Sequence, residues 1–248
     1  MNNRIISCKV KTTQIINNWL KFNQRLFSGQ CLLCTTPSQQ DADLCSACFQ
    51  ALPWHNVSQC LQCGLPSNHP ICGHCLHEPP DFDATFAALR YEFPLDAVMQ
   101  HYKYGSALQT AHLFAHLMTT QLAKQQDKRA IDLIMPMPLH PQRLKERGFN
   151  QSLEIARILS KSTHIPLDFQ SAIRTIYTPP QASLALKERA KNIKGAFAVH
   201  ADLSNQRIAI VDDVMTTGAS LNELAKMLKK AGAAHVECWV VARTLPPT

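Results

Sequence analysis

Glycine is scarce in this 248-residue sequence, and long apolar runs are missing. Only 8 residues are glycine, and neither a G-x-x-x-x-G-K-[ST] nor a G-x-G-x-x-G pattern occurs. The sequence therefore lacks the glycine-rich loops of P-loop proteins and of dinucleotide-binding folds. No uncharged apolar run approaches the roughly 18 residues of a membrane-spanning helix, so we expect no stable membrane insertion. Apolar residues still make up 46% of the chain, which is enough for a packed core.

Each of two N-terminal stretches lacks charges of one sign, the first negative and the second positive. Residues 1–30 contain five basic residues and no acid, whereas residues 31–80 contain three acids and no lysine or arginine. The net charge of +7 is completed by a surplus of five basic residues in 81–248. A mild basic excess permits an anionic partner but does not require one. Residues 31–80 do not suit a finger that grips nucleic acid, because phosphate contacts need cations.

Cysteine, in contrast, is abundant, and eight of the 10 cysteines form four C-x-x-C pairs. Two residues between thiolates let both sulfurs reach one tetrahedral ion, so four pairs predict two structural zinc ions. Disulfides and an iron–sulfur cluster are the alternatives. The first expected site consists of Cys31, Cys34, Cys45 and Cys48, and the second of Cys60, Cys63, Cys72 and Cys75. Interleaved pairing also fits the spacing. The nearby histidines are expected at the surface and not as ligands; they are His55, His69, His74 and His77.

Three regions follow from these patterns. Residues 1–30 form an amphipathic extension, residues 31–80 a cysteine-rich double zinc-binding module, and residues 81–248 an α/β domain. Apolar residues at spacings of three and four predict a short helix over 13–26, which docks on the rest of the protein or lies on a membrane surface. Its apolar run is interrupted, unlike that of a secretory signal, so we expect a cytoplasmic protein with reduced thiols.

Strand and helix patterns alternate in residues 81–248. Strands are predicted at 84–91, 131–135, 207–211 and 235–242. Helices are predicted at 95–104, 107–124, 142–160 with an interruption at Gly148, and 219–230. This alternation is typical of a mostly parallel sheet covered by helices on both faces. Ligands bind such sheets beyond the carboxyl ends of the strands.

Residues 208–220 (IAIVDDVMTTGAS) occupy that kind of position. An apolar strand delivers two carboxylates at its end, and a short loop rich in threonine then leads into a helix. Backbone N–H groups and hydroxyls at a helix N-terminus can cradle a phosphate. Neighbouring carboxylates can accept hydrogen bonds from vicinal sugar hydroxyls. Together these features predict a site for a phosphorylated ribose.

The same thirteen residues resemble the phosphoribosyl-pyrophosphate motif of type I phosphoribosyltransferases. This resemblance implies a type I phosphoribosyltransferase-like sheet, with Asp212 and Asp213 on the ribose 2- and 3-hydroxyls. It also implies a loop around the 5-phosphate, formed by Met215, Thr216, Thr217, Gly218, Ala219 and Ser220.

Three further stretches resemble the ComF (ComFC- or GntX-like) family. Residues 136–151 match P-x-P-L-H-x-x-R-x-x-x-R-G-F-N-Q, residues 181–192 match Q-x-x-L-x-x-x-x-R-x-x-N, and residues 241–244 (VART) fit the family's ending. A cysteine-rich head before a transferase-like domain is also similar. The family is associated with natural competence, meaning uptake of single-stranded DNA, or with use of DNA as a nutrient.

Two basic stretches accompany the motif. Arg143, Lys145 and Arg147 follow a predicted strand end and can hold pyrophosphate or a nucleic-acid backbone, although a solvated helix start is the alternative. The second stretch is expected to cover the site or to be an exposed charged helix; it comprises Arg174, Lys187, Arg189, Lys191 and Lys194. No aromatic ladder lies among these residues, so a base-stacking channel is not supported.

Two functions follow from the resemblance. In the first, the chain handles incoming single-stranded DNA, or a nucleotide, through the ribose-phosphate site and its basic loops, and a DNA-uptake or helicase protein is a partner. In the second, it is an active phosphoribosyltransferase that moves ribose 5-phosphate from phosphoribosyl pyrophosphate to a nucleobase or related amine with Mg²⁺. No base-recognition segment is identifiable, so the sequence leaves catalysis undecided.

Overall fold

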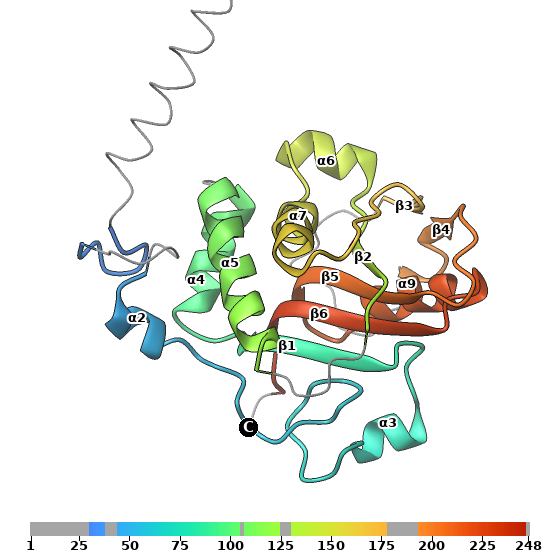
Figure 1. The fold of residues 1–248 in the computed structure, drawn as a ribbon, viewed down its shortest axis with the longest axis horizontal. Coiled ribbons are helices and arrows are strands. Elements are labelled where there is room, and N and C mark those ends of the chain that lie inside the picture. The colour runs from blue at the N-terminus through green and yellow to red at the C-terminus, as the bar shows by residue number, and fades with distance from the viewer. Residues whose placement is uncertain (1–29, 38–43, 105–106, 125–129, 178–192, 247–248) are drawn as a thin grey trace, which may run out of the picture. The chain divides into compact units, whose positions relative to one another are not determined.

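The computed structural model describes residues 30–37, 44–104, 107–124, 130–177 and 193–246 (Figure 1). The chain divides after Leu52 into two compact units, 1–52 and 53–248. The second group of four cysteines therefore belongs to the same unit as the sheet. The boundary expected at residue 80 stays a prediction. The helix expected over 13–26 lies outside the described residues, as do Lys187, Arg189 and Lys191.

Four parallel strands form the central sheet in the order β1-β6-β5-β2. They are β1 (Ala84–Arg90), β2 (Leu133–Pro136), β5 (Arg207–Met215) and β6 (His235–Arg243). The two central strands pair along their length, from Arg207 opposite His235 to Met215 opposite Arg243. Because both faces of such a sheet are covered, its strands are nearly continuous apolar runs. The predicted parallel sheet is confirmed.

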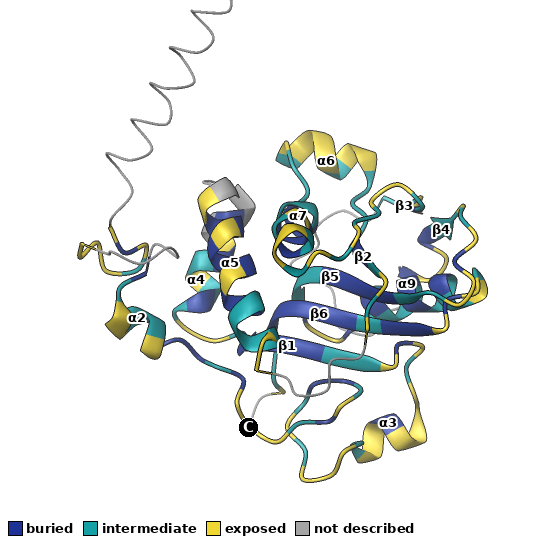
Figure 2. Ribbon diagram, viewed as in Figure 1, coloured by how far each residue is buried: buried dark blue, intermediate teal, exposed yellow. Residues whose placement is uncertain are grey.

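Helices cover the two faces of this sheet (Figure 1). The helices after β1 are α4 (Leu95–Tyr104), α5 (Ala107–Leu122), α6 (Pro141–Arg147), α7 (Gln151–Thr163) and α9 (Ala219–Lys230). Of these, α5, α7 and α9 pack against the strands of the sheet. On one face α5 packs against β1 and β6, and α7 packs against β2 and β5. On the other face, Leu224 and Leu228 of α9 share a core cluster with Ile208 and Ile210 of β5. The buried strands between these layers are visible in Figure 2.

Local sequence signals set the helix ends near the sheet's carboxyl edge. Gly148 ends α6 in the left-handed conformation, with φ of 79°, which glycine adopts without a steric penalty. The side chain of Asn150 then caps α7 by accepting hydrogen bonds from the N–H groups of Ser152 and Leu153. The interruption predicted at Gly148 is therefore confirmed.

Two features differ from the sequence expectation. β5 runs on to Met215 and does not stop at the acids, because its ladder with β6 continues through Asp212 and Val214. A small antiparallel sheet of two strands, β3 (Ala172–Arg174) and β4 (Phe197–Val199), was not predicted. Two further short helices, α2 (Ser46–Gln50) and α3 (Gly73–His77), lie in the cysteine-rich region.

Among the described residues, no helix has the length and apolar character needed to cross a membrane.

Candidate functional site

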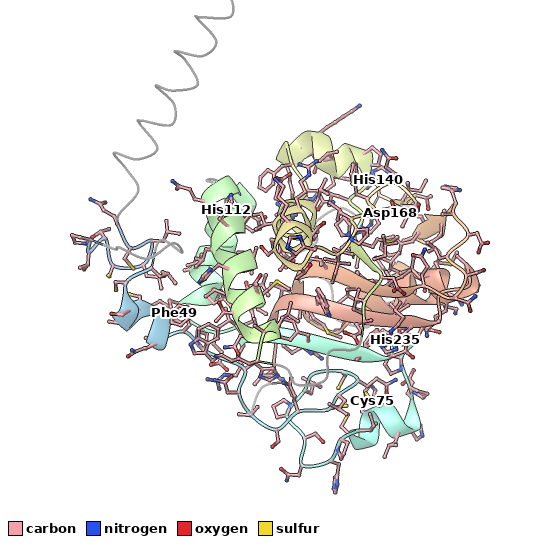
Figure 3. The ribbon with its side chains drawn as sticks, viewed as in Figure 1. Phe49, Cys75, His112, His140, Asp168 and His235 are labelled. Carbon is pink, nitrogen blue, oxygen red and sulfur yellow. The ribbon has the colours of Figure 1, made fainter. Side chains whose placement is uncertain are left out.

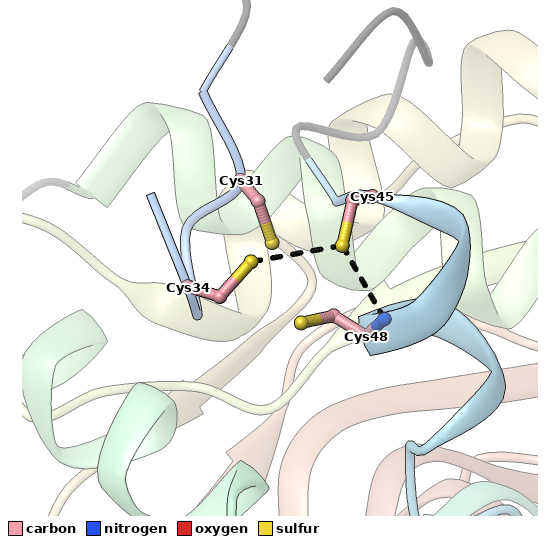
Figure 4. Close-up of side chains that lie close together, drawn as sticks. All are labelled: Cys31, Cys34, Cys45 and Cys48. Carbon is pink, nitrogen blue, oxygen red and sulfur yellow. Dashed lines mark hydrogen bonds between the residues drawn. The ribbon is translucent and has the colours of Figure 1, made fainter. Parts of the chain in front are cut away.

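The eight paired cysteines form two groups of four, in the pairing that the sequence predicted first. Within each group the four sulfurs all lie within 4.8 Å of one another (Figure 4 shows the first group). The sulfurs of Cys34 and Cys45 are 3.6 Å apart, and those of Cys63 and Cys72 are 3.7 Å apart. Four sulfurs placed tetrahedrally at about 2.3 Å from one zinc ion are about 3.8 Å from each other. Both groups therefore fit zinc.

The two groups repeat one local design. The first cysteine of each accepts a hydrogen bond on its carbonyl from the residue after the second cysteine: Thr35 to Cys31 and Gly64 to Cys60. Thr35 and Gly64 both have positive φ, of 59° and 70°. The third cysteine of each group, Cys45 or Cys72, is the N-cap of the short helix that carries the fourth. We call the segment around each first pair a knuckle, residues 31–35 and 60–64.

Hydrogen bonds favour the thiolate, the form that binds zinc, at Cys34 and Cys60, whereas burial raises the pKa of Cys63 to about 11. The side chain of Thr36, with its hydroxyl 3.3 Å from the sulfur, lowers the pKa of Cys34 to about 6. Burial of Cys60 opposes ionisation, but backbone N–H groups of Cys63 and Cys72 outweigh it and lower the pKa of that thiol to about 7. The closed tetrathiolate groups leave no position for a substrate, so zinc would have a structural role here.

The histidines near the cysteines join neither group. His69, His74 and His77 are exposed, as predicted. The expectation of a surface position was wrong for His55, which is buried, with its Nε2 2.7 Å from the carbonyl oxygen of Gly64. Burial lowers the pKa of His55, so the ring is a neutral structural element behind the second knuckle.

The two adjacent acids lie near the carboxyl end of β5, and their carboxylates are oriented by hydrogen bonds. Asp212 Oδ1 accepts a hydrogen bond from the hydroxyl of Ser152, at 2.8 Å, and another from the N–H of Asp213, at 2.9 Å. Asp213 Oδ1 accepts one from the N–H of Val214, at 2.7 Å. Ser152 is in the first turn of α7, so this helix and the acid pair are held together.

Both acids line a pocket of about 290 Å³, here called the acid–arginine pocket. Its walls come from the ends of β2, β3 and β5, from both ends of α6, and from the first turns of α7 and α9. The lining residues are Met137, Pro138, Leu139, His140, Arg143, Arg147, Asn150, Gln151, Ser152, Arg174, Asp212, Asp213 and Ser220. Figure 3 labels His140 on the side of the β2 edge and Cys75 of the second cysteine group beyond the β1 edge. The pocket thus brings Asp212, Asp213 and Ser220 together with Arg143 and Arg147.

The arginines of this pocket are held by polar neighbours. Arg143 pairs with Glu146 at 2.7 Å, and the same glutamate accepts a hydrogen bond from the Tyr177 hydroxyl. The hydrogen bond from Tyr177 has the larger effect on the pKa of Glu146, and both contacts lower it. Arg147 donates to the side-chain oxygen of Gln151 at 3.0 Å. Lys145 is exposed on α6 and is not part of the lining, and Arg189 lies outside the described residues.

The loop after β5 lines a second pocket of about 690 Å³, here called the loop pocket. Met215, Thr216, Thr217, Gly218 and Ala219 form one wall, whereas Cys63, His74 and Cys75 of the second cysteine group contribute to another. Gly218, with φ of 82°, is the N-cap of α9 and has no side chain to cap it, and the hydroxyl of Thr217 accepts a hydrogen bond from the N–H of Ala219, at 3.3 Å. Uncapped N–H groups at a helix start attract anions. The predicted phosphate-loop residues are therefore shared between two pockets, with only Ser220 in the first.

Three lining residues were not singled out as ligands by sequence reasoning. The side-chain nitrogen of Gln151 is buried and has no hydrogen-bond partner among the described residues, so it is a donor available to a ligand. Ser152 holds Asp212. Arg174 was grouped with the second basic stretch, but it lies on β3 and lines the pocket. Gln151 is the last residue of the stretch 136–151 that resembles the ComF family, and this resemblance was the sequence signal that could have identified it.

Two family profiles match separate stretches of the chain. The family profile described as double zinc ribbon domain matches residues 22–76. The profile described as phosphoribosyl transferase domain matches residues 150–245. With the two four-cysteine groups and the parallel sheet, these matches confirm the predicted fold class, and the two Cys₄ zinc-ribbon sites support structural zinc.

Curated relatives cover nearly the whole chain. DNA utilization protein YhgH of Salmonella typhi is 33% identical over 223 residues, which are 88% of this chain and 98% of that protein. Competence protein F of Haemophilus influenzae is 32% identical over 210 residues, which are 81% of this chain and 90% of that protein. Among solved structures, glutamine phosphoribosylpyrophosphate amidotransferase from B. subtilis has a TM-score of 0.39 and 17% identity, over 57% of this chain and 30% of that chain. On the evidence of its relatives, the chain belongs to the ComF family of competence and DNA utilization proteins.

Proposed function

We propose that the acid–arginine pocket binds a phosphorylated ribose and that the chain uses it in DNA utilization, on single-stranded DNA or on nucleotides. The observation that carries this proposal is the convergence of two carboxylates and three arginines on one cavity at the carboxyl edge of the sheet. Carboxylates accept hydrogen bonds from ribose hydroxyls, and arginine forks bind phosphate oxygens. A ligand with both groups would use both kinds of side chain.

The 5-phosphate is proposed to lie on the loop 215–220. The exposed Thr216 and Thr217 supply hydroxyls there, and the start of α9, which has no cap from Gly218, supplies N–H groups. Because Ser220 lines the acid–arginine pocket while the preceding residues line the loop pocket, this loop separates the two cavities. A phosphate at the start of α9 would then be within reach of the first cavity.

The test is calorimetric titration of the full chain with phosphoribosyl pyrophosphate and Mg²⁺. Replacing both acids (Asp212→Asn with Asp213→Asn) should weaken binding at least about tenfold, because a hydrogen bond to a charged group contributes about 1.5–3 kcal/mol. The matched control is Asp132→Asn, which removes an acid from the other end of the sheet, where Asp132 accepts a hydrogen bond from the N–H of Arg207. Unchanged affinity in the double variant would exclude the acid pair as the ribose site.

Catalysis as a phosphoribosyltransferase is the second candidate, favoured by the domain match over residues 150–245. The reaction would form a bond from an acceptor nitrogen to the anomeric carbon and break the bond to pyrophosphate, which leaves with the electron pair, while the acceptor nitrogen gives up its proton to solvent. Asp212 and Asp213 supply the oxygen ligands that Mg²⁺ prefers, and the arginines would stabilise the departing charge. Release of pyrophosphate in the presence of a nucleobase, lost in the double acid variant, would establish this function over binding alone.

A partner for DNA handling is part of the proposal. The relatives' names concern competence and DNA utilization, and we infer that this chain acts with a DNA-uptake or helicase protein in the cytoplasm. The cysteine-rich region has no lysine or arginine over residues 31–80, which suits contact with a protein better than contact with phosphates. Co-purification of a tagged chain with such a protein, lost when residues 1–52 are removed, would support this role.

A further inference from the structure

Arg243 is a buried cation that contacts both the second knuckle and the loop after β5. It is the last residue of β6, and only 3% of its surface is exposed. Its Nε donates to the carbonyl of Cys63 at 2.9 Å. Its Nη1 donates to the carbonyl of Met215 at 2.9 Å and also to that of Thr216. One side chain therefore joins a zinc-ligand residue to the loop that we propose binds phosphate.

Neighbouring contacts hold the same two segments. Thr85 of β1 donates its N–H to the carbonyl of Leu61, at 2.9 Å, and its hydroxyl to that of Gln62, at 2.6 Å. With Arg243, the sheet thus holds three successive carbonyls of the knuckle. The Thr85 hydroxyl is also 3.9 Å from the sulfur of Met215, whose methyl group lies against Gly218. Movement of residues 61–63 would therefore disturb both ends of the loop 215–218.

Electrostatics makes this junction depend on the state of the cysteine group. A zinc ion held by four thiolates has a formal charge of about −2, and the guanidinium of Arg243 is always positive. A buried charge is tolerated when it is paired and hydrogen-bonded, and removing its partner is strongly destabilising. Loss of zinc would change the charge beside this guanidinium and would release the Cys63 carbonyl from its fixed position.

We propose that Arg243 is a positioning residue that links zinc occupancy of the second cysteine group to phosphate binding by the loop 215–220. This inference rests on the proposed function, because it concerns the same loop. Linkage between two sites is reciprocal: if zinc strengthens phosphate binding, the phosphate strengthens zinc binding by the same factor. The first cysteine group lies in the other compact unit, so it serves as an internal reference.

The experiment measures zinc release from the full chain to a chromogenic chelator, with and without ribose 5-phosphate. Ribose 5-phosphate is the probe because it has the phosphate and the hydroxyls but lacks the pyrophosphate, which itself binds metal ions. Cys34→Ser leaves only the second site to be observed, and Cys63→Ser leaves only the first. Coupling of this kind usually changes affinity by about fivefold or more. At an unchanged rate of zinc association, saturating ribose 5-phosphate should therefore slow release from the second site at least about fivefold and leave the first site unchanged.

Two variants separate positioning from general stability. Arg243→Lys keeps the charge but cannot reach both segments. It should bring the ratio of the zinc release rate without ribose 5-phosphate to the rate with it, at the second site, down to about one. A merely structural role would speed release with and without the probe equally and leave the ratio intact. Arg90→Lys is the matched control, because Arg90 is the register partner of Arg243 on β1; the ratio should not change.

Calorimetry on the same samples distinguishes the possible failures. If ribose 5-phosphate does not bind the zinc-loaded wild type, the proposed function fails, and the linkage fails with it. If it binds but release from the second site is unaltered, only the linkage is overturned. The wild-type ratio decides the matter even if Arg243→Lys does not fold.

Discussion

At the scale of single residues, the turn after β5 depends on the missing side chain of Gly218. Its φ of 82° is in the left-handed region, and a Cβ built there would be 2.7 Å from the methyl carbon of Met215. Met215 is itself buried. A larger residue would therefore strain the backbone and also displace a core side chain that supports the loop.

Gly218→Ala should lower the free energy of unfolding by about 2 kcal/mol, of which about 1–2 kcal/mol is the cost of the left-handed conformation. Displacing Met215 from its preferred rotamer adds about 1 kcal/mol at most. Gly195→Ala is the matched control, because Gly195 has φ of 72° but nothing within 4 Å of an added Cβ. Urea unfolding of both variants checks the difference, and equal losses would show that Met215 accommodates the methyl group without cost.

At the scale of elements, the first turn of α7 organises the acid–arginine pocket. Asn150 caps the helix through its side-chain oxygen and donates through its nitrogen to the carbonyl of Met137, which follows β2, at 3.1 Å. Two residues later, Ser152 donates to Asp212 of β5. The start of one helix is thus bonded to the ends of two strands that border the pocket.

Asn150→Ala should lower the free energy of unfolding by about 1 kcal/mol, because an N-cap lost to alanine typically costs that much. Asn150→Ser keeps a capping oxygen but does not reach Met137, so it should retain most of the stability. Thermal unfolding checks the first effect, and titration with phosphoribosyl pyrophosphate shows whether the bond to Met137 matters for the pocket. Equal destabilisation by serine and alanine would place the role of Asn150 in that bond and not in capping.

Elements with a strong local signal were predictable from the sequence, and the exceptions depend on distant partners. The apolar runs of the central strands and the helix over Ala219–Lys230 lie where the pattern put them. The small β3–β4 sheet has three residues in each strand, which is too short for a periodic signal, and its two strands are far apart in the sequence. β5 continues through two aspartates, which have low strand propensity, because β6 pairs with them.

The site was predictable only in its local motifs. Asp212, Asp213, Arg143 and Arg147 stand next to strand ends, and they meet in one pocket. The junction at Arg243 could not be inferred, since it joins residues 180 positions apart in the sequence. Its sequence signals were its place in the quoted stretch 241–244 (VART) and at the end of an apolar strand, where a buried arginine requires partners.

At the scale of the whole molecule, positive charge is unevenly distributed and is concentrated outside residues 31–80. In the described part of the larger unit, Arg143, Arg147 and Arg174 converge on one pocket. If single-stranded DNA binds through this pocket, its affinity should depend on salt through these residues, because each neutralised phosphate releases counterions.

Arg143→Ala should reduce the slope of log affinity against log salt concentration for single-stranded DNA by about 0.7, the value for one phosphate contact on a single strand. Arg157→Ala is the matched control. It removes the same charge from a similar ion pair three residues apart, Arg157 with Glu154 at 2.8 Å, but Arg157 does not line the pocket. Fluorescence anisotropy with a labelled oligonucleotide across salt concentrations gives both slopes. A parallel slope for Arg143→Ala and the wild type would remove Arg143 from the DNA contact. An equal decrease in both variants would mean that net charge, and not the pocket, attracts DNA.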